Sequence, residues 1–191
     1  YFFGLSSPSG VESRTQRTLS PRSKPAGQTR FPTFSMNRKS SPASERGDLL
    51  AAYHRVLTGA DELRRLAAAK AWSVWEGRTA TLLPDERVAS HFAQAHVALS
   101  MARIECHYFM HDAFLRPNQL LEEAARLEGI PGVIVHGRYD AICPLENAWE
   151  LHHAWSGSQL AIIADAGHSA AEAGTRRRLV EATDELAKCP W

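Results

Sequence analysis

The feature that most constrains the fold is a change of apolar period after Gly129. From residue 48 up to that residue the apolar positions recur at helical spacing, whereas residues 133–135 form a short Val-Ile-Val run between Pro-Gly and His-Gly. Such a run predicts a buried parallel strand. Three further elements are expected, namely a helix over residues 144–155, a strand over 160–163 and a terminal helix over 175–188. This order predicts a right-handed βαβ unit, and two strands are too few for a complete α/β domain.

Two polar residues follow the expected strands. Asp140 comes just after the first strand, and His168 lies in the turn after the second, behind Gly167. The carboxyl ends of parallel strands are where catalytic groups collect, so Asp140 could fix the tautomer of His168 and His168 could act as a general base. Taken singly, Asp140 fits a turn acid and His168 a packing or capping histidine. Their order and spacing together favour the acid and base of a hydrolase triad.

A nucleophile for this triad is absent from the 191 residues. When the chain order is Ser, then Asp, then His, the serine is carried on a G-x-S-x-G turn between a strand and a helix. No G-x-S-x-G occurs in the sequence. Because loss of a triad nucleophile costs a factor on the order of 10⁶ in rate, the chain alone is expected to be inactive.

Residues before Gly129 have the pattern of a helical domain. The signals predict helices over residues 49–57 with Asp48 as N-cap and Gly59 as stop, 61–76 ending at Gly77, 84–114 as one long helix, and 118–127 with Asn118 as cap and Gly129 as stop. Thr175 is the expected N-cap of the terminal helix. These elements place a helical domain at residues 47–128 and an α/β part at 129–191.

Residues 1–46 differ in composition from the rest. They contain ten Ser and eight Lys or Arg against two Glu, a charge of +6, which leaves −5 for the remainder because the whole chain carries +1. No apolar period runs through them, so a disordered leader is expected. An Arg-rich and Ser-rich terminus also fits a plastid or mitochondrial transit peptide, the alternative to a cytoplasmic location. No basic stripe with aromatics follows, which argues against nucleic-acid binding.

The cysteines and the hydropathy of the chain bear on whether it is a disulfide-rich, zinc-binding or membrane protein. Cys106, Cys143 and Cys189 are odd in number and lack C-x-x-C spacing, which argues against a disulfide framework and a zinc knuckle. No apolar run reaches the ~18 residues of a membrane span. A soluble protein with reduced thiols and no cofactor or metal is expected. A weaker alternative is a metal site at His107 and His111, which are four residues apart on an expected helix.

Several stretches resemble a known family. They are residues 130–140 (IPGVIVHGRYD), 143–149 (CPLENAW), 165–169 (DAGHS), 69–76 (AKAWSVWE) and 102–109 (ARIECHYF). Together they resemble proline iminopeptidases, the prolyl aminopeptidases of the α/β-hydrolase superfamily. The resemblance covers residues 44–191 and implies a partial α/β-hydrolase fold, the C-terminal strands and helices of the core, with an all-helical cap domain. The family's oxyanion and nucleophile segments are missing.

The resemblance also implies roles for individual residues. Asp140 and His168 would be the triad acid and base, and Glu76 and Glu105 would hold the free imino group of a peptide's N-terminal proline. Cys143 would lie near the proline pocket, although an ordinary buried thiol is an open alternative. Cys106 stands where the family usually has asparagine. The implied activity is a serine-type exopeptidase, with a noncatalytic interaction fragment, an esterase or an epoxide hydrolase as alternatives. The oligomeric state stays open.

Overall fold

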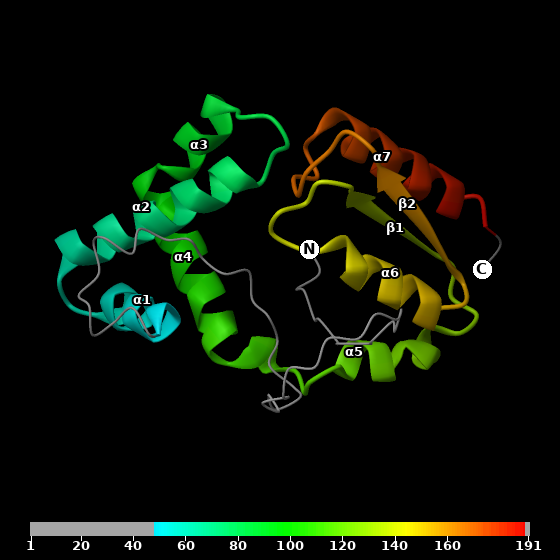
Figure 1. Cartoon of the computed structure of the whole chain (residues 1–191), viewed down its shortest axis with the longest axis horizontal. Helices are drawn as coiled ribbons and strands as arrows, with labels where there is room; N and C mark the ends of the chain where they lie inside the picture. Colours follow the sequence, from blue (N-terminus) through cyan, green and yellow to red (C-terminus); the bar gives the residue numbers. More distant parts are fainter. Residues whose placement is uncertain (1–47, 190–191) are drawn as a thin grey trace, which may run out of the picture.

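The computed structural model describes residues 48–189 and combines a helical part with a part built on a small parallel sheet (Figure 1). The helical part contains α1 (Leu49–Thr58), α2 (Glu62–Thr79), α3 (Glu86–Phe92) and α4 (Ala95–Met110). The second part contains α5 (Gln119–Glu122), η3 (Ala124–Leu127), β1 (Gly132–Gly137), α6 (Leu145–Ala154), β2 (Ser158–Ile163) and α7 (Ala173–Leu186). The leader expected at residues 1–46 lies outside the described residues.

Aspartate caps begin the first two helices. The Asp48 carboxylate accepts from the backbone N–H of Ala51 at 3.0 Å, and Asp61 accepts from Arg64 at 3.0 Å. The expected cap and start of α1 are thus confirmed. The expected end of α2 at Gly77 is wrong, because the helix continues to Thr79. Gly77 instead allows close packing, since a Cβ there would lie 3.0 Å from the Phe92 ring of α3.

The single long helix expected over residues 84–114 is also wrong. It is divided into α3, which begins after the N-cap Asp85, and α4, which begins after Gln94. Gln94 has extended backbone angles, φ −63° and ψ 134°, which break the helix. Neither Gly nor Pro marks this break, and apolar residues recur at helical spacing on both sides of it. After α4 the chain turns through the short 3₁₀ helix η2 (Asp112–Phe114), whose residues have positive φ.

The core of the helical part forms around Trp72 of α2, which is 1% exposed. Small side chains of α4 face it, and the fully buried members of this cluster are Leu57, Ala69, Ala98, Ala102 and Cys106. Tyr53 meets the Trp72 ring edge-on with centroids 5.5 Å apart, and Phe109 stacks at 6.1 Å. The small residues let α4 approach α2 closely, which sets the position of the side chains carried by both helices.

The short helix expected over residues 118–127 forms as two pieces, α5 and η3. Asn118 occupies the N-cap position of α5, as expected, but in a left-handed conformation, φ 57°, and its side chain makes no capping hydrogen bond. Gly129 closes the segment with φ 79°, as expected for a residue without a Cβ.

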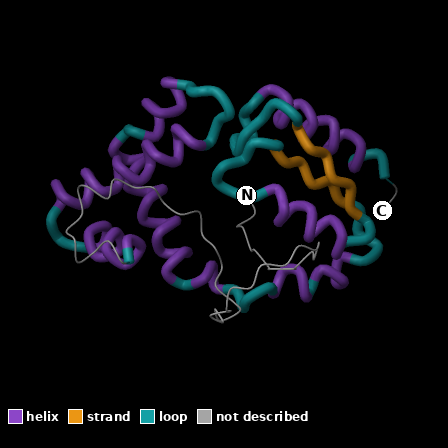
Figure 2. Tube along the Cα trace, in the orientation of Figure 1, coloured by secondary structure: helices purple, strands orange, loops and turns teal. Residues whose placement is uncertain are grey.

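The sheet confirms the expected βαβ unit. Strands β1 and β2 pair in parallel from Gly132 opposite Ser158 to Gly137 opposite Ile163, with α6 between them in sequence. Figure 2 shows this two-stranded sheet beside α6 and α7, which both contact it. The described residues therefore form a mixed α/β structure that is mostly helical.

The terminal helix begins earlier than expected. Helix α7 starts at Ala173, after Glu172, so the prediction that Thr175 is its N-cap is wrong. Thr175 is buried within the first turn. The Glu172 carboxylate does not cap the helix; it accepts from the backbone N–H groups of Leu82 at 2.9 Å and Gly167 at 2.6 Å. This acid therefore ties the loop before α7 to the helical part.

Among residues 48–189, no helix combines the length and the hydropathy that crossing a membrane requires.

Candidate active site

Asp140 is fixed by its own loop just after β1. Its Oδ1 accepts from the backbone N–H groups of Ile142 at 2.9 Å and Cys143 at 2.8 Å. The side chain is only 5% exposed. Because both donors hold the same oxygen, the loop wraps around the carboxylate and directs Oδ2 toward the loop that follows β2.

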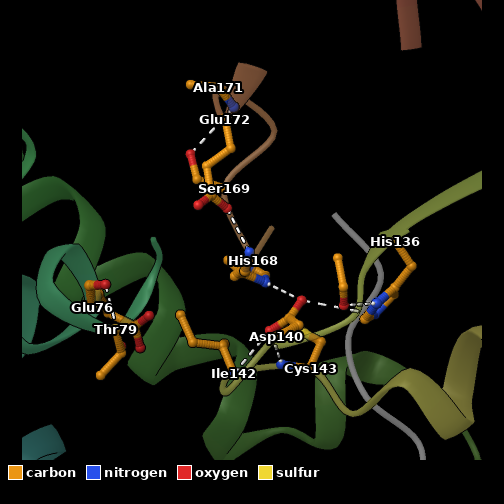
Figure 3. A network of polar contacts seen from close by, with 12 residues as sticks. Glu76, Thr79, His136, Asp140, Ile142, Cys143, His168, Ser169, Ala171 and Glu172 are labelled. Atoms are coloured by element: carbon orange, nitrogen blue, oxygen red, sulfur yellow. Dashed lines mark hydrogen bonds and ion pairs between the residues drawn. The ribbon is translucent and has the colours of Figure 1, made fainter. Parts of the chain in front are cut away.

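His168 lies in that second loop and contacts Asp140 directly (Figure 3). The distance from His168 Nδ1 to Asp140 Oδ2 is 2.9 Å. A carboxylate only accepts, so Nδ1 carries the proton of this bond and Nε2 faces elsewhere. The structure therefore brings together the two residues that the sequence predicts as acid and base.

Backbone contacts hold the two loops in register. Tyr139 N–H donates to the carbonyl of Ala166 at 3.0 Å, and Arg138 N–H donates to Ile163 at 2.9 Å. The histidine loop is also attached to the helical part, because Ser169 N–H donates to the carbonyl of Ala80 at 2.7 Å. The histidine is thus held between the sheet and the end of α2.

The Asp140–His168 pair shifts the protonation of both members. Burial opposes charge on each, but the hydrogen bond from His168 and the two loop N–H groups outweigh it and lower the pKa of Asp140. For His168, burial is likewise outweighed by Asp140 and by a hydrogen bond with Cys143, which raise its pKa to about 10. In this chain the pairing with Asp140 therefore favours the charged imidazole more strongly than in a free histidine.

Glu76 of α2 and Glu105 of α4 lie on the helical side of His168. Glu76 is 5% exposed, and Glu105 accepts from Trp72 Nε1 at 2.7 Å. Burial, then the charge of Glu105, raises the pKa of Glu76 to about 8, while His168 acts in the opposite direction. Burial also raises the pKa of Glu105, against the Trp72 hydrogen bond and the charge of His168. Both carboxyl groups are thus within electrostatic reach of the histidine.

Cys143 lies beside the same pair. One ligand atom each of Asp140, Cys143 and His168 lies within 4.8 Å of the others. All three line a cavity of about 210 Å³ between β1, α5, α6 and α7, whose other walls are mainly apolar. Glu76 and Glu105 are not among its lining residues. The cavity and the two glutamates therefore approach the Asp140–His168 pair from different elements.

Two other residues contact the candidate site, and neither was identified from the sequence as a site residue. His136 Nε2 lies 3.7 Å from Asp140 Oδ2, and its Nδ1 bonds the carbonyl of Gly137 at 2.9 Å. Its place four residues before Asp140, at the end of a strand, was the available signal. For Trp72, the partner of Glu105, no local signal existed because the two are 33 positions apart.

The histidines of the alternative metal site are engaged with each other and with an aromatic ring. His107 and His111 have ring centroids 4.5 Å apart, and His111 stacks on Phe114 at 5.1 Å. His111 Nδ1 bonds the carbonyl of His107 at 2.7 Å. Among the described residues, the group of three metal-ligating side chains is not here but at Asp140, Cys143 and His168.

Comparison with known proteins shows which curated proteins this chain resembles in sequence. No family model matches the chain. Proline iminopeptidase of Xanthomonas citri is 54% identical over 147 residues, which is 76% of this chain and 47% of that protein. Proline iminopeptidase of Xylella fastidiosa strain 9a5c is 53% identical over 146 residues, which is 47% of that protein. Proline iminopeptidase of Arabidopsis thaliana is 41% identical over 147 residues, which is 39% of that protein.

The chain spans about half the length of the curated relatives that it matches. Among solved structures, an esterase from Exiguobacterium antarcticum is 18% identical with a TM-score of 0.46, covering 74% of this chain and 48% of that one. At that level the likeness carries no argument about this chain. The matches to curated sequences do carry an argument. Over about three quarters of its length the chain is a homologue of proline iminopeptidases.

Proposed function

We propose that this chain supplies the acid, the base and the amine-binding carboxylates of a prolyl aminopeptidase, a serine-type exopeptidase that releases N-terminal proline from peptides. The observation that carries the proposal is the 2.9 Å contact between His168 Nδ1 and Asp140 Oδ2 at the carboxyl ends of two parallel strands. Homology to proline iminopeptidases supports the same reaction class.

In this proposal His168 acts through Nε2. Asp140 holds the Nδ1–H tautomer, so that Nε2 can take the proton of a serine and later give it to the leaving amine. No G-x-S-x-G occurs in the 191 residues, so the serine and the oxyanion donors come from a segment outside them. The chain alone is then inactive. Residues 129–191 form the C-terminal part of an α/β-hydrolase core, and residues 47–128 form its helical cap.

Glu76 and Glu105 provide selection for a free N-terminus. An N-terminal proline carries a protonated secondary amine, which two neighbouring carboxylates hold by charge-assisted hydrogen bonds. Their raised pKa values fit this role, because two buried acids without a cation between them favour the protonated form. An ammonium group bound there also lowers the pKa of His168 by repulsion, which favours the neutral imidazole that general-base catalysis requires.

Cys143 is proposed to line the proline pocket, since its thiol borders an apolar cavity next to His168. We place the enzyme in the cytoplasm, a proposal supported by three cysteines that form no disulfide. Its partners are peptides with N-terminal proline. Neither nucleic acid nor a membrane has a part in the proposed function.

Complementation tests the proposal. This chain is co-expressed with the segment of the Xanthomonas citri relative that the match leaves uncovered, and release of proline from proline naphthylamide is followed. Activity is expected only for the pair, with a loss on the order of 10³-fold or more for His168→Ala and Asp140→Asn. The exposed Asp165→Asn is the matched control and should retain activity.

Substrate choice separates the amine-binding role from the triad. Glu76→Gln and Glu105→Gln should reduce the preference for proline naphthylamide over its N-acetylated form while hydrolysis continues. If the complemented pair is active and His168→Ala has no effect, the triad assignment is wrong. A soluble complex of both segments that hydrolyses nothing favours a noncatalytic interaction fragment, and one that prefers acyl esters favours an esterase.

A further inference from the structure

We propose that Asp140, Cys143 and His168 form a binding site for a soft divalent cation, with Zn²⁺ as the ion that fits best. These side chains already lie together in this chain, independently of any peptidase activity. A zinc site goes beyond the proposed function because a bound ion occupies the groups that a triad needs. Zinc would therefore act as an inhibitor that withdraws the acid and the base together.

The spacing of the ligand atoms suits one ion. Zinc binds nitrogen, oxygen and sulfur at about 2.0–2.3 Å in tetrahedral geometry, which places ligand atoms roughly 3.3–3.8 Å from one another. The three side chains already offer atoms within 4.8 Å of one another. His168 Nδ1 and Asp140 Oδ2 are 2.9 Å apart, so they need to separate by only a few tenths of an ångström. The ion takes the place of the proton between them.

The loop prepares two of the ligands. Asp140 Oδ1 is held by the N–H groups of Ile142 and Cys143, which leaves Oδ2 for the ion. Those bonds also turn the backbone around the carboxylate. The thiol of Cys143, three residues after Asp140, therefore lies near the Asp140 and His168 side chains. Such hydrogen bonding of a ligating carboxylate is the outer support that metal sites use.

His136 offers a fourth ligand. Its Nδ1 contacts the Gly137 carbonyl, which only accepts, so Nδ1 carries the proton and Nε2 has the free lone pair. Nε2 lies 3.7 Å from Asp140 Oδ2, within the tetrahedral spacing given above. A ligating histidine that donates its other N–H to a backbone carbonyl is the usual arrangement around zinc.

The chemistry of the ligand atoms indicates which ion the site prefers, and the cavity provides the space through which the ion reaches it. A thiolate with imidazoles favours zinc, whereas magnesium and calcium prefer oxygen ligands alone. The four side chains all line the 210 Å³ cavity, which can admit a hydrated ion. Two buried polar atoms that also belong to cavity-lining residues, Asn147 Nδ2 and Thr175 Oγ1, have no hydrogen-bond partner among the described residues.

Calorimetric titration of the whole chain with zinc chloride tests the site. One zinc per chain is expected, with affinity reduced at least about 10–100-fold by Cys143→Ser and by His168→Gln. Cys106→Ser and the double change His107→Gln with His111→Gln are matched controls and should bind as the unchanged chain does. Binding that is unaffected by Cys143→Ser, or abolished by the His107/His111 change, overturns the proposal.

Cobalt and alkylation give two further readouts, and the alkylation test uses the unchanged chain alone. Co²⁺ added to the unchanged chain should produce a thiolate-to-cobalt charge-transfer band, which Cys143→Ser removes and Cys189→Ser retains. Zinc should also protect Cys143, but not Cys189, from iodoacetamide, as followed by peptide mass spectrometry. Absence of both effects overturns the site. Since all of these measurements use the chain alone, their failure leaves the peptidase proposal intact, and failure of complementation leaves the zinc site intact.

Discussion

Gly137, the last residue of β1, lies directly against the carbonyl oxygen of Gly167, the residue before His168. A Cβ at position 137 would lie 1.9 Å from that oxygen and 2.7 Å from the carbonyl oxygen of Ala166. Both neighbours are backbone atoms, so a side chain cannot be accommodated by a rotamer change. The close approach of these two loops therefore sets the distance between Asp140 and His168.

Gly137→Ala should separate the two loops and lengthen the contact between Asp140 and His168. We expect a loss of about 1–3 kcal/mol in the free energy of unfolding, as for other overpacked sites, and a lower pKa of His168. Urea unfolding and histidine NMR titration measure the two effects. Gly77→Ala is the control: its Cβ meets the Phe92 side chain at 3.0 Å, so it should affect stability but not the His168 titration. An unchanged His168 titration in Gly137→Ala would contradict this explanation.

Asp140→Asn should lower the pKa of His168 from about 10 to near or below its ordinary 6.5. The substitution removes the charge and the strong acceptor, while burial continues to disfavour the imidazolium. NMR titration of the histidine ring protons measures the shift. Asp165→Asn, at an exposed position in the same loop, should leave the His168 titration as it is. A pKa near 10 in the Asp140→Asn variant would mean that another group holds the proton.

Glu76→Gln should reduce the dependence of stability on pH between about 4.5 and 8. Folded Glu76 keeps its proton up to about pH 8, whereas a glutamate in the unfolded chain loses it near 4.5. The folded state therefore binds more protons in this window, and the free energy of unfolding falls as pH rises through it, by a few kcal/mol at most. The variant lacks this contribution and keeps that of Glu105, whose pKa is also raised by burial.

Urea midpoints at a series of pH values test this expectation. His168 adds a separate fall between its ordinary 6.5 and about 10, because its pKa is also raised, and that part should persist in Glu76→Gln. The exposed Glu181→Gln should behave as the unchanged chain. Equal slopes in the unchanged chain and Glu76→Gln below pH 6.5 would rule out the raised pKa of Glu76.

Trp72→Phe should destabilise the helical part by about 1–3 kcal/mol, because it leaves the Glu105 carboxylate without its donor in a mostly buried place. Packing loss contributes as well, so a double-mutant cycle with Glu105→Leu is needed to isolate the hydrogen bond. We expect a positive coupling energy in urea unfolding. If Trp72→Phe costs the same with and without Glu105, the hydrogen bond adds nothing to stability.

Local signals in the sequence predicted much of the secondary structure. The Asp48 cap, the stop at Gly129 and the change of period before β1 each depend on neighbouring residues, and the structure agrees with them. Some predictions that failed lacked a local signal, and others followed a local signal that tertiary packing overrode. The break at Gln94 carries neither Gly nor Pro, and Gly77 serves a contact with α3 instead of ending a helix.

The same division applies to the candidate site. The sequence by itself determined that Asp140 and His168 each follow a strand, since the apolar runs and the turns after them are local properties of the chain. Only the tertiary structure decided that Glu76 and Glu105 come within reach of His168, that Trp72 bonds Glu105 and that Cys143 and His136 surround Asp140. The pKa shifts of Glu76, Glu105 and His168 arise from burial and from partners far away in sequence, and these exist only once the chain is packed.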